Sequence, residues 1–128
     1  MTKHVQTTIA IAVAFLVVSA AAAQDVPPEM KVLEQRVGAW ETKSTAKPAV
    51  WTPDGFTHTT FEKIDLVLKG HFIQARTVNQ TDKSEATWLA TYDVNKKAYR
   101  FWYHNSFGHS MESSGQWDEK TKTLRWVD

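Results

Sequence analysis

The sequence predicts an all-β domain, an antiparallel up-and-down meander that forms a sandwich or a barrel, preceded by one short helix. After residue 38 the hydrophobic period changes from helical to alternating and stays alternating. Turn signals divide that part of the chain into seven short segments at hairpin spacing. A chain of 128 residues is long enough for one such domain and too short for two.

The composition narrows the class of protein further. The chain has no cysteine, so it can form neither a disulfide nor a thiolate zinc site. Its net charge of +1 argues against electrostatic binding of nucleic acid, and we expect no nucleic-acid partner. Aromatic residues make up 12% of the chain, and this share is too high for a disordered protein.

Residues 1–23 have the pattern of a cleaved secretory signal peptide. Lys3 gives a positive start, residues 9–18 are an unbroken apolar run, and the small residues Ala21-Ala22-Ala23 form the cleavage site. The apolar run is about half of the roughly 20 residues that a membrane-spanning helix needs. We therefore expect a periplasmic or secreted bacterial protein with no membrane span after cleavage. The alternative is a retained membrane anchor.

The elements of the mature domain, residues 24–128, follow from local signals. A helix is expected over residues 28–37, where Met30, Leu33 and Val37 share one face, and Gly38 ends it. Strands are then expected over residues 39–47, 56–68, 71–78, 86–92, 98–105, 110–117 and 123–127. Barrel closure usually takes about eight strands or more. The last strand stops within an apolar run, so we expect a domain that lacks its last strands.

Alternation within three consecutive strands gathers aromatic residues on one face. A sealed core would favour Leu, Ile and Val, because each buried Tyr or Trp needs a partner for its polar atom. We therefore expect this face to line a ligand pocket; the alternative is that the same rings fill a solid core. The predicted lining residues are Trp88, Tyr92, Tyr99, Phe101, Tyr103 and Trp117.

Two polar residues are further candidates for that pocket. Gln74 and Arg76 share one face of their strand. If the face is inward, they form the polar end of the pocket, since a guanidinium can bind a carboxylate through two hydrogen bonds. If it is outward, they are solvated.

No catalytic constellation is apparent, and we expect no catalytic residue, no metal and no cofactor. His104 and His109 flank a turn without a third ligand of a metal site. Glu62 and Asp65 lie on opposite faces of one strand and cannot act there as an acid and base pair. An enzyme with a site at the barrel mouth would have only scattered His and Asp residues to support it.

A short helix followed by Gly38-Ala39-Trp40 resembles the opening of the lipocalin-like (calycin) barrels. In those barrels the helix closes the bottom and the Trp plugs it, which implies structural roles for Gly38 and Trp40. The wider set of motifs is similar to an exported bacterial family of the domain of unknown function 1579 type. These motifs are Val37-Gly38-Ala39-Trp40-Glu41, Lys47-Pro48, Leu68-Lys69-Gly70-His71-Phe72-Ile73, Thr91-Tyr92-Asp93, Tyr99-Arg100-Phe101-Trp102 and Ser106-Phe107-Gly108.

The resemblance implies a lipocalin-like barrel but no activity. In haem-binding barrels of this type the axial His lies in the region that follows residue 128, so haem binding does not carry over. The leading hypothesis is an exported barrel that binds a small apolar or amphipathic molecule. The alternative is a non-catalytic envelope or interaction domain with a filled core and no ligand, whose surface candidates are Trp51, Phe56 and Trp102.

Overall fold

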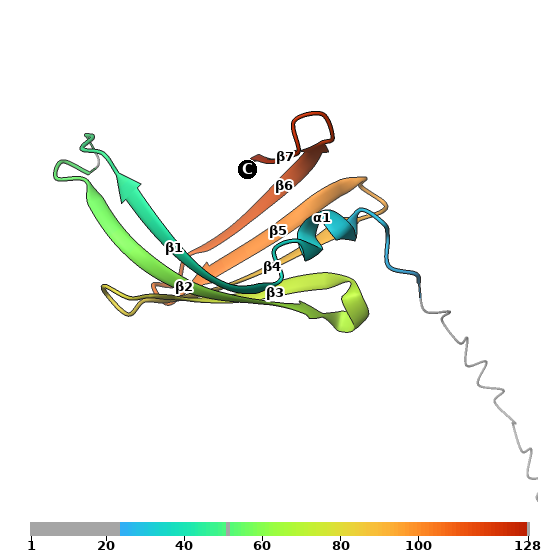
Figure 1. The fold of residues 1–128 in the computed structure, drawn as a ribbon, viewed down its shortest axis with the longest axis horizontal. Coiled ribbons are helices and arrows are strands. Elements are labelled where there is room, and N and C mark those ends of the chain that lie inside the picture. The colour runs from blue at the N-terminus through green and yellow to red at the C-terminus, as the bar shows by residue number, and fades with distance from the viewer. Residues whose placement is uncertain (1–23, 51, 128) are drawn as a thin grey trace, which may run out of the picture.

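The computed structural model describes residues 24–50 and 52–127, which form a single antiparallel sheet and two short helical segments (Figure 1). The expected signal peptide (residues 1–23) and Trp51 lie outside the described residues. In chain order the elements are α1 (Met30–Glu34), β1 (Gly38–Ala46), β2 (Phe56–Val67), the 3-10 turn η1 (Leu68–Gly70), β3 (Phe72–Asn79), β4 (Glu85–Asp93), β5 (Ala98–Asn105), β6 (Ser110–Asp118) and β7 (Thr123–Val127).

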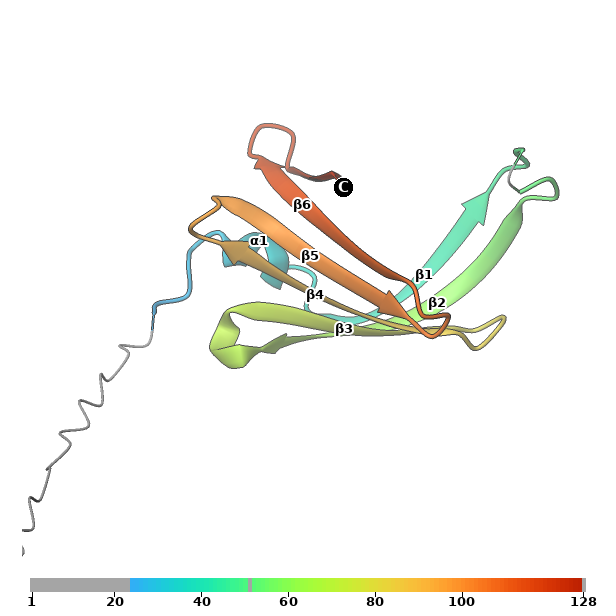
Figure 2. The ribbon, with the colours of Figure 1, turned by 180° about the vertical axis from the view of Figure 1, so that it is seen from behind.

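The seven strands follow one another across the sheet in chain order, and each pairs antiparallel with the next. The predicted all-β meander is therefore confirmed. The natural twist of the strands curls the sheet into a half-barrel, with β1 and β7 as its two edges (Figures 1 and 2). None of the described helices is long and apolar enough to cross a membrane.

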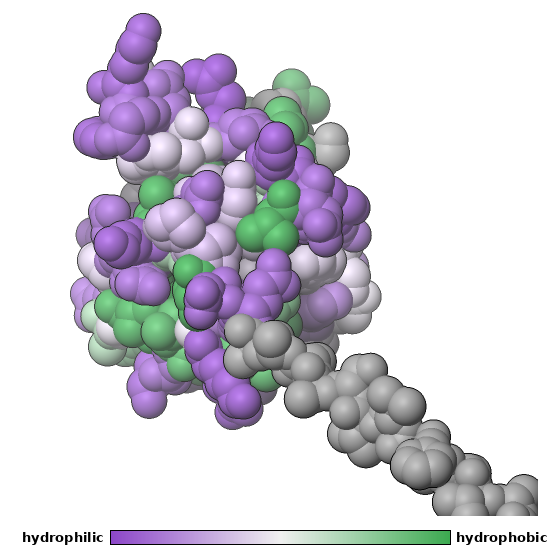
Figure 3. All heavy atoms as spheres, turned by 90° about the vertical axis from the view of Figure 1, so that its right-hand side faces the viewer, coloured by the Kyte–Doolittle hydropathy of each residue, from purple (hydrophilic) through white to green (hydrophobic). Residues whose placement is uncertain are grey.

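The core lies on the concave face of the sheet, at the end where α1 packs against β3 and β4. Met30 and Leu33 of α1 are buried against Ile64, Ile73 and Trp88. From outside, this end of the domain is mostly hydrophilic with apolar patches between (Figure 3). The short helix thus covers apolar surface that a curled sheet alone would leave in water.

The helix is shorter than the predicted 28–37. It ends at Glu34, and Val37 is exposed instead of sharing the buried face of Met30 and Leu33. Gly38 does not cap the helix but is the first residue of β1, with φ of +138°. That backbone conformation strongly favours glycine, and it redirects the chain from the helix into the sheet. The need to turn into β1 therefore ends the helical segment early.

Four consecutive strands, β3 to β6, each end on an Asn or Asp that closes the following turn. In each case the side-chain Oδ1 accepts a backbone N–H two residues later, at 2.8 to 3.1 Å. The four residues are Asn79, Asp93, Asn105 and Asp118. Asx turns of this kind are a local signal, which explains why the hairpin positions could be predicted.

Gly115 in β6 leaves room for an aromatic ring from β7. A Cβ atom at this position would lie 2.7 Å from the ring of Trp126 on the neighbouring strand. We predict that Gly115→Ala displaces that ring and lowers the free energy of unfolding by about 1–3 kcal/mol, the usual cost of overpacking. Urea denaturation followed by tryptophan fluorescence measures this change.

Ser114→Ala is the matched control, because Ser114 is the neighbouring residue of β6 and its side chain lies on the opposite face. We expect this control to stay within about 0.5 kcal/mol of the wild type. Equal stability of Gly115→Ala and the wild type would show that the ring of Trp126 does not need the glycine.

Candidate functional site

The candidate site is the concave face of the sheet, defined by the side chains that share a face with Trp88. In the strand register Trp88 lies opposite Tyr103, Ala90 opposite Phe101, and Tyr92 opposite Tyr99. Trp117 of β6 packs against the same core cluster. The structure therefore brings all six predicted aromatic residues together on one face.

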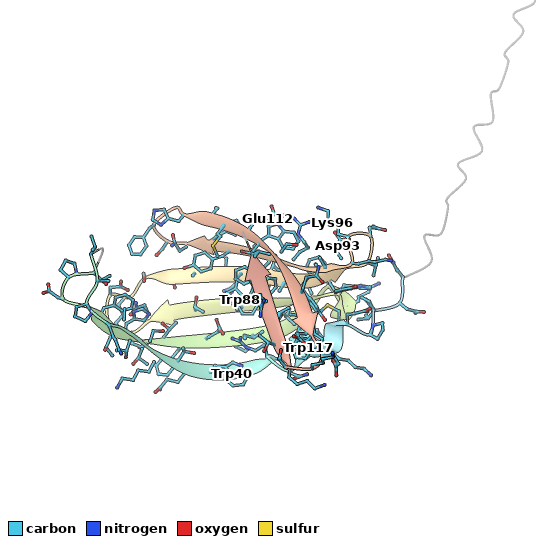
Figure 4. The ribbon with its side chains drawn as sticks, turned by 90° about the horizontal axis from the view of Figure 1, so that it is seen from above. Trp40, Trp88, Asp93, Lys96, Glu112 and Trp117 are labelled. Atoms are coloured by element: carbon cyan, nitrogen blue, oxygen red, sulfur yellow. The ribbon has the colours of Figure 1, made fainter. Side chains whose placement is uncertain are left out.

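Toward α1 this face is filled by rings that pack against each other. The ring centres of Trp88 and Phe101 are 5.5 Å apart, and those of Tyr92 and Tyr99 are 5.0 Å apart. Phe101 also contacts Trp126 of β7, at 5.4 Å between ring centres. Seen from above, Trp88 lies near the middle of the sheet and Trp117 toward the end that carries α1 (Figure 4). This part of the face is a packed aromatic core.

Some large apolar side chains of the same face remain accessible to solvent. Trp40 of β1 is 44% exposed and Met111 of β6 is 45% exposed. Leu66 and Trp126 are exposed as well, and the register places all four on the concave side. We call the concave face with these exposed apolar side chains the trough.

The carboxylate of Glu62 lies among these apolar side chains, and the sequence did not predict it as part of the site. The Glu62 side chain is 12% exposed, and its Oε2 accepts a hydrogen bond from Trp88 Nε1 at 2.9 Å. Its Oε1 accepts one from the Arg36 guanidinium at 3.2 Å. A carboxylate oxygen can accept more than one hydrogen bond. Glu62 is therefore a fixed carboxylate acceptor beside the ring of Trp88.

The alternation of side chains along β2 indicates that Glu62 lies on the concave face. Thr60, Glu62 and Ile64 share a face, and Ile64 is fully buried, so Glu62 had to lie inward. Its partners could not be inferred, because Arg36 and Trp88 are each 26 residues away in the sequence. The prediction that Glu62 and Asp65 face opposite ways is confirmed, since Asp65 pairs with Lys63 on the outer face at 3.7 Å.

Trp40 and Gly38 lie where the chain passes from α1 into β1. Trp40 Nε1 donates a hydrogen bond to the Arg36 carbonyl oxygen at 2.7 Å. The Arg36 guanidinium lies 5.9 Å from the centre of the same ring. Trp40 thus holds the segment between α1 and β1 at one edge of the sheet (Figure 4), and through Arg36 it also supports Glu62.

Gln74 and Arg76 do not join the aromatic residues. Gln74 lies opposite Leu89 and Arg76 opposite Thr87, whereas Ala75 lies opposite Trp88. Because successive side chains of a strand point to opposite faces, Ala75 takes the inward position and its two neighbours face outward. The interpretation in which they form the polar end of the aromatic pocket is therefore wrong.

The histidines show no metal site in the part of the chain that the structure describes. No group of three or more His, Asp or Glu side chains is placed there to hold a metal ion. His104 Nδ1 lies 2.8 Å from Ser110 Oγ, and the two residues are directly opposite each other on β5 and β6. This hydrogen bond gives His104 a structural partner.

The surface aromatics of the alternative hypothesis differ in their surroundings. Phe56 is exposed and stacks on His58, with 5.1 Å between ring centres. Trp102 is half-buried on the outer face, 6.5 Å from the ring of Phe72 and 5.5 Å from the Arg100 guanidinium. These two residues lie on separate parts of the sheet and do not form one continuous patch.

Comparison with known proteins places the chain in a family without an assigned activity. Residues 26–127 match the family model described as "Protein of unknown function (DUF1579)". No curated protein matches the chain.

Tyr99 is the most deeply buried phenol of the concave face, at 3% exposure, and its hydroxyl donates to the Glu29 carbonyl oxygen at 3.0 Å. Burial, followed by the nearby charge of Glu29, raises its pKa from 10 to about 12. Below pH 10 this shift has no effect on stability. Between pH 10 and 12 the unfolded state loses its phenol proton first, so the free energy of unfolding falls.

We predict that Tyr99→Phe flattens this alkaline decline. Lysines lose protons over the same range in both proteins, so the quantity to compare is the difference between them. Urea denaturation at about pH 9 and about pH 11 measures it, because this interval spans the onset of phenol ionisation in unfolded chains. An identical loss of stability in both proteins would contradict the burial of this hydroxyl.

Proposed function

This chain belongs to the DUF1579 family of proteins of unknown function, and we propose that it is an exported protein that binds a small apolar or amphipathic molecule in its concave trough. The observation that carries the proposal is the exposed apolar surface of the trough. Side chains such as Met111 and Trp126 stay in water beside a packed aromatic core.

Small-molecule sites are usually concave and lined mainly by apolar side chains. Covering such a surface contributes about 25 cal/mol for each Å² of apolar area removed from water. Apolar residues scattered singly over a protein surface need no explanation, but these share one face. The contact of Phe101 with both Trp88 and Trp126 makes the buried and the exposed parts of that face continuous.

Glu62 supports the proposal that the ligand can be amphipathic. Its carboxylate is held in place by Trp88 and Arg36, so a ligand meets a preorganised acceptor beside apolar walls. A ligand hydroxyl or amine at this point would satisfy it further. Pockets that combine apolar lining with a few placed polar groups commonly bind small molecules, and no covalent chemistry is proposed.

The competing function is an interaction domain with a filled core and no ligand. The ring contacts of Trp88, Phe101 and Trp126 favour it for the part of the face near α1. The two functions differ in what they require of the trough. A small molecule needs the open part of the concave face, whereas a filled-core domain would not respond to apolar ligands at all.

Titration with N-phenyl-1-naphthylamine, a neutral apolar fluorescent probe, tests the proposal. We predict saturable binding that changes the tryptophan fluorescence of the protein, because Trp40 and Trp126 lie on the trough. Met111→Gln places an amide in the trough and is expected to weaken binding about tenfold, the equivalent of roughly 1.4 kcal/mol.

Phe61→Gln is the matched control. Phe61 is 47% exposed, close to the exposure of Met111, but it lies on the outer face. We expect this variant to bind the probe as the wild type does. Unchanged tryptophan fluorescence throughout the titration, or equal weakening in both variants, would favour the filled-core interaction domain.

Export is tested by fractionation of the bacterial cell. We predict that the protein is found in the periplasm or the medium, and that N-terminal sequencing of the recovered protein begins at Gln24, because Ala21-Ala22-Ala23 forms a signal peptidase site. An intact N-terminus in the cytoplasmic fraction would contradict export.

A further inference from the structure

The β3–β4 and β5–β6 turns lie side by side (Figures 1 and 2). Beside them the outer face carries a groove. Its volume is about 490 Å³, and its lining includes Gln74, Arg76, Glu85 and His104. The two turns are joined by a hydrogen bond from the Ser106 N–H to the Glu85 carbonyl oxygen at 2.8 Å. This groove lies on the opposite side of the sheet from the trough.

Two positive charges lie next to each other on the outer face, and one of them, Arg76, lines this groove. Lys63 of β2 lies directly opposite Arg76 of β3, and like charges in such a pair destabilise a sheet. Lys63 is offset by Asp65 at 3.7 Å. Arg76 is exposed and makes no ion pair with any other described residue. The cation therefore sits at a position that costs stability, without an anionic partner of its own.

A neighbouring side chain offers a hydrogen-bond donor to the same groove. Ser106 Oγ accepts the Glu85 N–H at 3.0 Å, which leaves its hydroxyl proton as a donor. Ser106 lines the groove together with Arg76.

We propose that this groove binds a small oxyanion, a carboxylate or a phosphate group, through Arg76 and Ser106. The guanidinium offers two parallel N–H donors to such a group, and the hydroxyl adds a neutral donor. Glu85 is the one carboxylate in the lining, and it opposes the anion. Gln74, which adjoins Arg76 on the same face, lines the groove as well.

Isothermal titration of the whole protein at low ionic strength tests this site, with inorganic phosphate and acetate as separate probes. We expect saturable binding of at least one of them, and the stronger binder identifies the class of anion. Arg76→Gln should weaken that binding at least tenfold, whereas Glu85→Gln should tighten it. Arg125→Gln removes the same charge from the outer face of β7, outside the groove lining, and should leave affinity unchanged.

Arg76 is exposed, so we expect Arg76→Gln to keep the fold, and an unchanged midpoint of thermal unfolding checks this. The proposal is overturned if neither anion binds saturably. Equal weakening by Arg125→Gln and Arg76→Gln would also overturn it.

Discussion

The structure depends on one constraint: a single curled sheet has no second layer, so its concave face must be covered by its own side chains and by α1. Met30 and Leu33 of the helix supply most of this cover at one end. A five-residue helix has little stability of its own in water, so it is held by this packing. The helix ends where Gly38 turns the chain into β1, and the aromatic rings fill the space beyond.

Because the sheet is a single layer, its concave and outer faces differ in the side chains that they carry. On the concave side the carboxylate of Glu62 lies among apolar side chains, where it is neutralised by Arg36 and oriented by Trp88. On the outer side Arg76 lies in a groove whose lining also includes Gln74, Glu85 and His104. Strict alternation along each strand means that neighbouring residues such as Ala75 and Arg76 serve different surfaces. One thin sheet can therefore present two unrelated surfaces for ligands.

Most of the fold was predictable because its signals are local. Alternation, together with Asn or Asp at the end of each of the strands β3 to β6, places the hairpins within a residue or two. The aromatic face could be predicted for the same reason. The helix length could not, because the turn at Gly38 is imposed by the sheet and not by the helical sequence.

The placement of β3 against the aromatic face and the partners of Glu62 depend on contacts between distant segments. Phe72, Gln74 and Arg76 on one side of β3 include two strongly polar side chains, so alternation already favours the side of Ile73, Ala75 and Thr77 as the buried one. The pairing of Ala75 with Trp88 places that side on the aromatic face. The hydrogen bonds that Glu62 accepts from Arg36 and Trp88 likewise join distant segments, so the alternation within one strand cannot predict them.

The sequential strand order bears on how such a domain folds and changes over evolution. Every strand pairs only with its neighbours in the chain, so the interactions between strands have short sequence separations and a low contact order for a β protein. Each hairpin from β3 onward is also closed by its own Asx turn. A strand gained or lost at the β1 or β7 edge would leave the remaining pairings in register, so this architecture can vary in strand number without being rebuilt.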